Sequence, residues 1–221
     1  MANLKVHGVS LSPFVRKVLF ALAYKEQPYD QVNVFPGDTS DEFAAISPLN
    51  KIPVLEDDGF TIPDSSIILR YLEAKFPEKP LYPADPQQQA RACWLEEYAD
   101  TKLTECCAGL FRERFLARAF FKRDPDEALI QTILTETIPP VLDYLESVVQ
   151  AEGFFLGDHL TVADLGITSA FCAASYADFQ PDAKSHPKLA GYVARAMESP
   201  IVVARMAEEQ KAAANLGVSS Q

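Results

Sequence analysis

The chain has 221 residues and a mass of 24.4 kDa, a length that allows one large domain or two small ones. Its formal net charge of −11 argues against nucleic acid and an anionic membrane surface as partners, because both attract a clustered basic face. No segment approaches the roughly 18 apolar residues of a transmembrane helix, and no secretion signal is apparent, so we expect a cytoplasmic protein with no membrane partner.

Metal chemistry is not expected. The four cysteines have no CxxC spacing, and the three histidines are scattered rather than placed near them. All four cysteines fall in apolar helical stretches, which favours buried free thiols in a reducing compartment over disulfides. The cysteines are Cys93, Cys106, Cys107 and Cys172.

The first 76 residues predict a small α/β domain. Residues 4–7 form a short strand candidate that Gly8 closes. Ser12 and Pro13 are favoured at the N-cap and first position of a helix, which the spacing of apolar residues extends to about Tyr24.

Three further strands and two helices complete this domain. Residues 29–34 alternate enough for a strand, and a short helix candidate ends near Ala45. Residues 54–55 and 60–62 flank an Asp-Asp-Gly turn, and a helix over 67–74 follows Asp64 and Ser65. The predicted order is βαβ, short helix, ββα, with a mixed sheet.

Four prolines between residues 76 and 86 predict an extended linker, because proline cannot continue a helix. After Pro86 the pattern is helical throughout. We therefore predict an N-terminal domain over 1–76, a linker over 77–86 and an all-α helical bundle over 87–221.

Within the helical domain, residues 87–121 form a long periodic segment and 126–149 form another, predicted to break near Pro139 and Pro140. Thr161-Val162-Ala163-Asp164 has the pattern of a capping box, with Asp in place of the usual Glu, before a helix over 165–176. Two further helices are predicted over 187–197 and 200–214.

Two sites in the first domain favour an anionic, peptide-like ligand. Ser12 begins a helix, where free N–H groups and the helix dipole stabilise negative charge such as a thiolate. Pro53 removes a ladder donor at a strand start, and Asp64-Ser65 begins another helix. A plain helix cap at Ser12, and a turn with an ordinary cap at the second site, explain the same residues.

These motifs together resemble the cytosolic glutathione S-transferase family, in its serine-type, theta-, delta- or phi-like branches. The resemblance covers essentially the whole chain and implies a thioredoxin-like first domain. It rests on Ser-Pro-Phe-Val-Arg-Lys-Val at 12–18, Asn-Lys-Ile-Pro-Val-Leu at 50–55, Asp-Ser-Ser-Ile at 64–67 and the box at 161–164.

The resemblance implies a set of glutathione contacts. Ile52-Pro53 matches the family's cis-proline, and the backbone of Val54 is expected to pair with the cysteinyl part of glutathione. Asp64 and Ser65 match the acidic-serine pair that holds the γ-glutamyl end. Lys51 is placed to meet the glycyl carboxylate, and Asn50 either assists it or forms a turn.

Ser12 matches the catalytic serine, which stabilises the glutathione thiolate. Ser10 is the rival, with a loop role favoured for it. Branches that use cysteine need one near this point, and none precedes Cys93. Branches that use tyrosine place it near the end of the first strand, where this chain has His7 and Val9.

The electrophile site is expected to be apolar. For each candidate residue the alternative interpretation is packing in the hydrophobic core, and for at least half of the candidates that interpretation is favoured. The candidates are Phe14, Phe35, Phe111, Phe115 and Phe171.

The resemblance implies an enzyme that conjugates glutathione, as co-substrate and without a metal, to small apolar electrophiles, and a homodimer. A glutathione-dependent isomerase of the maleylacetoacetate type is one alternative, although its Ser-Ser-Cys cluster is replaced here by Ser-Leu-Ser-Pro. A glutathione-dependent peroxidase or disulfide reductase is another. A non-catalytic binding or regulatory module is the alternative outside enzymes.

Overall fold

The computed structural model of the chain describes residues 3–215. It divides into two compact units, Met1–Tyr82 and Pro83–Gln221. The domain boundaries predicted at residues 76 and 87 stay a prediction. The outer ends of the two predicted domains, residues 1–2 and 216–221, lie outside the described residues.

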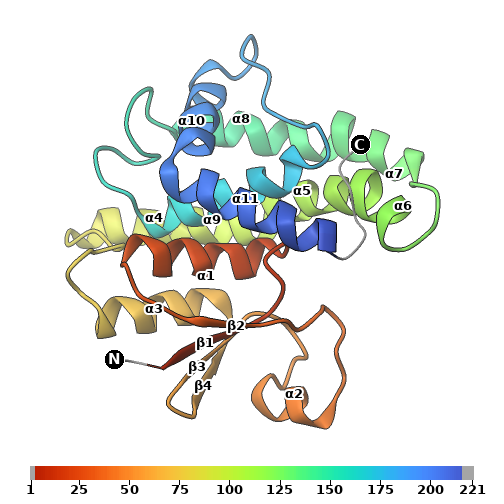
Figure 1. Cartoon of the computed structure of the whole chain (residues 1–221). Helices are drawn as coiled ribbons and strands as arrows, with labels where there is room; N and C mark the ends of the chain where they lie inside the picture. Colours follow the sequence, from red (N-terminus) through yellow and green to blue (C-terminus); the bar gives the residue numbers. More distant parts are fainter. Residues whose placement is uncertain (1–2, 216–221) are drawn as a thin grey trace. The chain divides into compact units, whose positions relative to one another are not determined.

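The first unit is a mixed four-stranded sheet in the order β2-β1-β3-β4. Strand β1 is parallel to β2 and antiparallel to β3, and β3 and β4 form an antiparallel hairpin. Figure 1 shows α1 and α3 side by side on one side of this sheet, with α2 apart from them. The elements are β1 (Leu4–His7), α1 (Pro13–Tyr24), β2 (Asp30–Val32), α2 (Asp41–Ile46), β3 (Val54–Asp57), β4 (Phe60–Pro63) and α3 (Ser65–Lys75).

The thioredoxin-like α/β fold predicted for this unit is confirmed, and so are β1 and α1. Helix α3 begins two residues before the predicted start at Ile67. The reason is the cap, because the Asp64 carboxylate accepts hydrogen bonds from the backbone N–H groups of Ser66 (3.0 Å) and Ile67 (3.1 Å).

A buried lysine fixes the proline-rich segment to the first unit. The Lys25 side chain is 1 % exposed, and its Nζ binds the Glu73 carboxylate at 2.7 Å. The same Nζ donates to the backbone carbonyls of Phe76 and Lys79, each at 2.8 Å. Because Glu73 also accepts from the N–H of Leu81, residues 76–81 are held against α1 and α3 without forming a helix.

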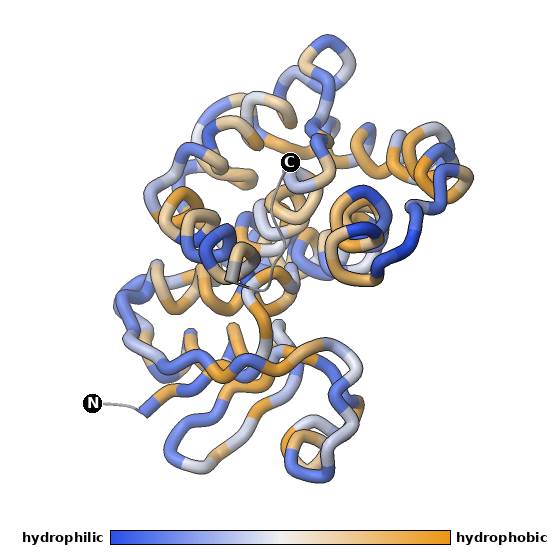
Figure 2. The backbone as a smooth tube through the Cα atoms, turned by 45° about the vertical axis from the view of Figure 1, so that its right-hand side comes forward, coloured by the Kyte–Doolittle hydropathy of each residue, from blue (hydrophilic) through white to orange (hydrophobic). Residues whose placement is uncertain are grey.

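The second unit is helical, which confirms the predicted fold class. Figure 2 shows hydrophobic and hydrophilic residues alternating along its helices, as expected for helices that bury one face. The elements are α4 (Pro86–Tyr98), η1 (Ala99–Leu103), α5 (Thr104–Phe111), η2 (Arg112–Leu116), α6 (Ala117–Ala119), α7 (Glu127–Thr132), η3 (Ile133–Thr137), α8 (Ile138–Val148), α9 (Val162–Ser175), α10 (Pro187–Glu198) and α11 (Pro200–Asn215).

The break predicted near Pro139 and Pro140 is wrong. The path is helical from Glu127 to Val148, and the prolines lie in the first turn of α8. They come one residue after the π-helical segment η3, which ends at Thr137, so their missing N–H groups fall where the α-helical hydrogen-bond pattern restarts.

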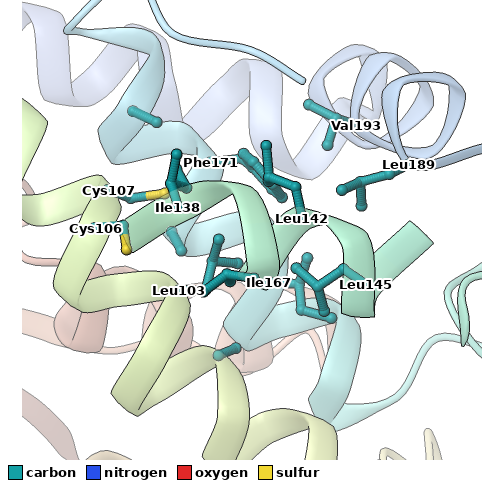
Figure 3. Close-up of a cluster of buried hydrophobic side chains, with 14 of the residues drawn as sticks. Leu103, Cys106, Cys107, Ile138, Leu142, Leu145, Ile167, Phe171, Leu189 and Val193 are labelled. Atoms are coloured by element: carbon teal, nitrogen blue, oxygen red, sulfur yellow. The ribbon is translucent and has the colours of Figure 1, made fainter. Parts of the chain in front are cut away.

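The core of the second unit is apolar and includes two of the four thiols. Figure 3 shows Cys107 beside Ile138, and Leu103 beside Ile167, within this core. The cysteines are free, as predicted, and three are buried, whereas Cys93 is half-buried.

The predicted capping box at the start of α9 is present and is part of a buried network. The Asp164 carboxylate accepts from the backbone N–H groups of Thr161 (2.8 Å) and Phe155 (2.7 Å) and from the Tyr192 hydroxyl (3.0 Å). Burial raises the pKa of the Asp164 carboxyl, against the opposing effect of these hydrogen bonds. The network ties the loop before α9 to α10.

A second buried carboxylate holds the loop between α6 and α7. The Glu113 side chain is 2 % exposed and binds Arg123 through both oxygens, at 2.6 and 2.8 Å. It also accepts from the N–H of Asp126 (3.0 Å) and from Nε of Arg112 (3.0 Å). The Arg123 hydrogen bonds are the largest effect on the pKa of Glu113 and, despite burial, lower it to about 2.

We predict that Glu113→Gln lowers the free energy of unfolding by about 3 kcal/mol at neutral pH, because the carboxylate loses its charged partners. A depressed carboxyl pKa contributes stability above the unfolded-state pKa and loses it as the pH falls through the folded-state pKa. The difference between the wild type and the variant therefore shrinks between about pH 5 and pH 2.

Denaturant unfolding followed by fluorescence of Trp94, the single tryptophan, measures this difference at each pH. Glu105→Gln is the control, because Glu105 is 67 % exposed and 3.9 Å from Lys102. A loss that is equal at neutral and acid pH, or equal to that of the control, contradicts the prediction.

Candidate functional site

The register of the sheet brings three of the predicted segments to one end of it. His7, the last residue of β1, pairs with Val54, the first residue of β3, and Val54 pairs with Pro63, the last residue of β4. The next residues in the chain are Gly8 after β1, Pro53 before β3 and Asp64 after β4. The loop toward Ser12, the Ile52-Pro53 segment and the Asp64-Ser65 pair therefore leave the sheet at the same end.

Ser12 lies at the N-cap of α1 and is half-buried. Its backbone N–H donates to the carbonyl of Val9 at 3.1 Å, which closes a turn over residues 9–12. Its side chain makes no hydrogen bond to the helix, and the hydroxyl has no partner within the part of the chain that the structure describes. The hydroxyl therefore stands at a helix N-terminus and is available to an anion.

Gly8 is the point of closest packing in this region. Its φ of +145° is in a region that side chains rarely adopt, and a Cβ there would lie 2.6 Å from Cγ2 of Val15 and 3.2 Å from Cβ of Ile52. Its N–H donates to the carbonyl of Val32 at 2.8 Å. Glycine thus lets the loop contact both α1 and the segment that contains Pro53.

The rival serine, Ser10, is engaged by a neighbouring strand. The side-chain amide of Gln31 in β2 donates through Nε2 to the Ser10 hydroxyl and to the carbonyl of Gly8, each at 2.9 Å. Ser10 Oγ also lies 3.3 Å from Oε1 of Gln31. Of the two serines, Ser10 is the one already bound to the protein.

The segment before β3 has a defined backbone. The Ile52–Pro53 peptide bond is cis, as predicted, and both residues are buried. The hydroxyl of Ser47, itself buried, accepts from the N–H of Lys51 at 3.0 Å and donates to its carbonyl at 2.7 Å. With its backbone fixed in this way, Lys51 keeps an exposed side chain.

Asn50 has a turn role. Its φ is +51°, and its N–H donates to the carbonyl of Ser47 at 2.8 Å. Its Oδ1 is buried without a hydrogen-bond partner within residues 3–215.

Asp64 and Ser65 form the start of α3. One oxygen of Asp64 is used by the helix cap, and its φ of +79° is a strained value for a residue with a side chain. Ser65 is 5 % exposed, and neither its N–H nor its hydroxyl has a partner among the described residues. The pair therefore combines a partly used carboxylate with open donors at a helix N-terminus.

The candidate pocket aromatics fall in both units. In the first unit, Phe14 is half-buried and Phe35 is 39 % exposed. In the second unit, Phe171 is 2 % exposed and belongs to the hydrophobic core, as the alternative interpretation expected.

Phe111 and Phe115 form an aromatic cluster that the sequence alone did not complete. The two rings stack at 5.3 Å, and the ring of Tyr176 lies 5.6 Å from Phe111 and 5.1 Å from Phe115. The Tyr176 hydroxyl donates to the Glu209 carboxylate of α11 at 3.3 Å. The cluster therefore joins three helices of the second unit.

Cys106 and Cys107 are poor nucleophiles. Burial raises the pKa of the Cys106 thiol to about 11 and the pKa of the Cys107 thiol further. No group of three His, Cys, Asp or Glu side chains placed to hold a metal occurs between residues 3 and 215. In the same range, no helix is both long and apolar enough to cross a bilayer.

Gln31, Ser47 and Tyr176 were missed from the sequence. Gln31 hydrogen-bonds a loop that is remote in sequence, and Ser47 hydrogen-bonds an irregular segment, so no periodic sequence pattern indicates either role. An unusual run of aromatics around 111–121 was the available signal for the cluster, but nothing connected it to Tyr176.

Comparisons with known proteins match both units of the chain. The N-terminal domain model of glutathione S-transferases matches residues 6–80, and the C-terminal domain model matches residues 111–209. The uncharacterised GST-like protein YibF of Escherichia coli is 32 % identical over 178 residues, which cover 80 % of this chain and 83 % of YibF.

Two further relatives cover most of the chain. FtsZ-localized protein A of Caulobacter vibrioides is 27 % identical over 79 % of this chain and 81 % of its own length. The structure of human glutathione S-transferase T1-1 in its apo form superposes with a TM-score of 0.82 at 25 % identity, covering 95 % of this chain and 89 % of that one. With its two-domain fold and both domain models matched, the chain belongs to the glutathione S-transferase family.

Proposed function

We propose that the protein is a glutathione transferase that conjugates glutathione to small apolar electrophiles, with Ser12 stabilising the thiolate. The observation that carries the proposal is the convergence of Ser12, Val54 and Ser65 at one end of the sheet. A tripeptide bound along the strand edge at the cis-proline would have its carboxylate at the N-terminus of α3 and its thiolate at the N-terminus of α1.

Ser12 is preferred over Ser10 because of hydrogen-bond availability. The Ser12 hydroxyl is uncommitted among the described residues, whereas the Ser10 hydroxyl is bound by Gln31. A hydroxyl that donates to sulfur, together with the helix dipole, favours the thiolate. Lowering a thiol pKa by about two units requires roughly 2.7 kcal/mol, which is within reach of one charged hydrogen bond plus the dipole.

The chemical step is a displacement or addition by sulfur. With an aryl halide, the glutathione sulfur forms a bond to carbon, the carbon–halogen bond breaks, the halide leaves and the thiol proton passes to solvent. Serine does not change its covalent state. Its contribution is to raise the fraction of glutathione that is ionised near neutral pH.

The other proposed contacts divide between glutathione and electrophile. Lys51, Ile52-Pro53 and Val54 meet the glycyl and cysteinyl parts, while Asp64 and Ser65 hold the γ-glutamyl end. Because one Asp64 oxygen already caps α3, its second oxygen is the one assigned to the glutathione ammonium. For the apolar electrophile, the proposed contacts from the first unit are Phe14 and Phe35.

We also propose a cytoplasmic homodimer. Free, buried cysteine thiols are typical of a reducing compartment. Leu49 and Ile67 of the first unit are 76 % and 51 % exposed, and such apolar side chains are candidates for burial between subunits. Sedimentation equilibrium gives the state directly, and a monomer at micromolar concentration contradicts the dimer.

A second candidate function is a binding module without catalysis. The observation that favours it is the similarity to FtsZ-localized protein A, whose name describes localisation rather than a reaction. The two functions are separated by measuring turnover, because a binding module adds nothing to the uncatalysed rate of reaction between glutathione and chlorodinitrobenzene at any protein concentration.

We predict that Ser12→Ala lowers kcat/KM for chlorodinitrobenzene by about 10- to 1,000-fold, as expected for the loss of one donor to a developing or resting anion. Glutathione affinity changes little, because the other contacts remain. The pH midpoint of kcat/KM moves upward. Steady-state rates and glutathione titration calorimetry measure these effects.

Ser10→Ala is the matched variant and loses at most a few-fold of activity, because Ser10 contacts Gln31. Full activity of Ser12→Ala combined with a large loss in Ser10→Ala would reject the assignment of the thiolate donor.

We predict that Ser65→Ala raises the dissociation constant of glutathione by about tenfold, corresponding to one hydrogen bond to a charged carboxylate. The kcat at saturating glutathione is nearly unchanged, because Ser65 is assigned to binding. Ser147→Ala is the control, since Ser147 only bonds a carbonyl of its own helix at 2.7 Å. An unaltered glutathione affinity in Ser65→Ala contradicts the proposed γ-glutamyl contact.

A further inference from the structure

Resting on the proposed role of Ser12, we infer that Gln31 is a positioning residue that sets where the Ser12 hydroxyl lies. Gln31 is the middle residue of β2 and is half-buried. It pairs in register with Val6 of β1, so its backbone is fixed in the sheet two residues from the start of the loop. Its side chain extends from that fixed point to the loop that leads to Ser12.

The amide of Gln31 holds the loop at two places. Nε2 donates to the carbonyl of Gly8 at 2.9 Å, and this carbonyl can only accept, which defines the orientation of the amide. Nε2 also donates to the Ser10 hydroxyl at 2.9 Å. The Gln31 side chain thus hydrogen-bonds both Gly8, which precedes the turn, and Ser10, which lies inside it.

The turn over residues 9–12, which Gln31 hydrogen-bonds, ends at Ser12. The bond from the Ser12 N–H to the Val9 carbonyl, 3.1 Å, closes a turn whose central residues are Ser10 and Leu11. On its far side, the Leu11 carbonyl accepts from Nη2 of Arg16 at 3.4 Å. Fixing Gly8 and Ser10 from β2 therefore fixes the path by which the chain enters α1 at Ser12.

This anchoring gives Ser10 a role distinct from that of Ser12. Ser10 is the point of attachment for Gln31, and Ser12 is the proposed donor to sulfur. Removal of the Gln31 amide leaves the α1 N-cap attached to the helix through the bond from the Arg16 N–H to the Ser12 carbonyl, 2.9 Å, but frees the turn before it. The hydroxyl is then displaced from the thiolate rather than lost.

Displacement of a reacting or stabilising group by about 1 Å costs up to about 100-fold in rate. The effect is expected on the thiolate and on kcat. The affinity for glutathione is expected to be spared, because Lys51, Val54 and Ser65 are held by other contacts.

The test compares Gln31→Ala with Gln27→Ala. Gln27 is the matched control, since it is also half-buried and its Nε2 donates to a backbone carbonyl, that of Lys25, at 2.8 Å, away from the loop. The readouts are kcat, KM for glutathione, the thermal midpoint, and the pKa of enzyme-bound glutathione from the ultraviolet absorbance of its thiolate.

The expected result for Gln31→Ala is a decrease in kcat of about tenfold and an upward shift of about one unit in the pKa of bound glutathione, with KM for glutathione within about twofold of wild type. Gln27→Ala behaves as wild type in these readouts. A Gln31→Ala enzyme with an unshifted thiolate pKa overturns the inference, even when its thermal midpoint falls, because a purely structural role affects stability alone.

Ser10→Ala keeps the inference testable if Gln31→Ala does not fold. It removes one of the two attachment points, so it is expected to shift the thiolate pKa in the same direction by a smaller amount. Where Gln31→Ala does fold, the two effects are expected to be non-additive in the double variant. An unshifted thiolate pKa in Ser10→Ala, or strict additivity, contradicts the inference. If Ser12→Ala itself is fully active, the proposed function fails. If Ser12→Ala is impaired and Gln31→Ala matches the control, only the role of Gln31 fails.

Discussion

The close packing at Gly8 is the constraint on which the candidate site depends. A side chain there would collide with Val15 of α1 and with Ile52, so the absence of a Cβ allows β1, α1 and the cis-proline segment to meet. Because His7 and Val54 pair in the sheet, the same contact brings the loop to Ser12 beside the start of β3. The candidate site residues are thus brought together by the close packing of the Gly8 backbone against Val15 and Ile52.

Two helix N-termini at this end of the sheet use their caps differently. One carboxylate oxygen of Asp64 caps α3 by accepting from the N–H groups of Ser66 and Ile67, which leaves the donors of Ser65 open. The Ser12 side chain makes no hydrogen bond to α1, so that helix start has no side-chain cap and has a hydroxyl beside it. A satisfied cap suits a site that must hold a ligand in one orientation, whereas an unsatisfied one suits a site that must respond to a charge appearing on sulfur.

Local sequence patterns predicted several of the helix starts and turns of the fold. The Ser12-Pro13 helix start, the hairpin turn and the box at Thr161 are each determined by neighbouring residues, and the structure has all three. The hydrogen bond from the Gln31 amide to the Gly8 carbonyl was not predictable, because it depends on the pairing of β2 with β1 rather than on sequence spacing. The continuous helix through Pro139 was missed for a related reason, since a π-helical segment leaves no periodic signal.

The two units hold their functional residues by different physical means. In the first unit, Ser47, Gln31 and Gly8 act on backbone atoms, so what they fix is the path of the chain. In the second, the Phe111 cluster is held by ring contacts and by the Tyr176 hydroxyl on Glu209. A substitution in such a cluster changes the shape and polarity of a surface without redirecting a backbone. Under the proposed function, the residues assigned to glutathione all lie in the first unit and depend on fixed backbone, which a substitution in the Phe111 cluster leaves in place.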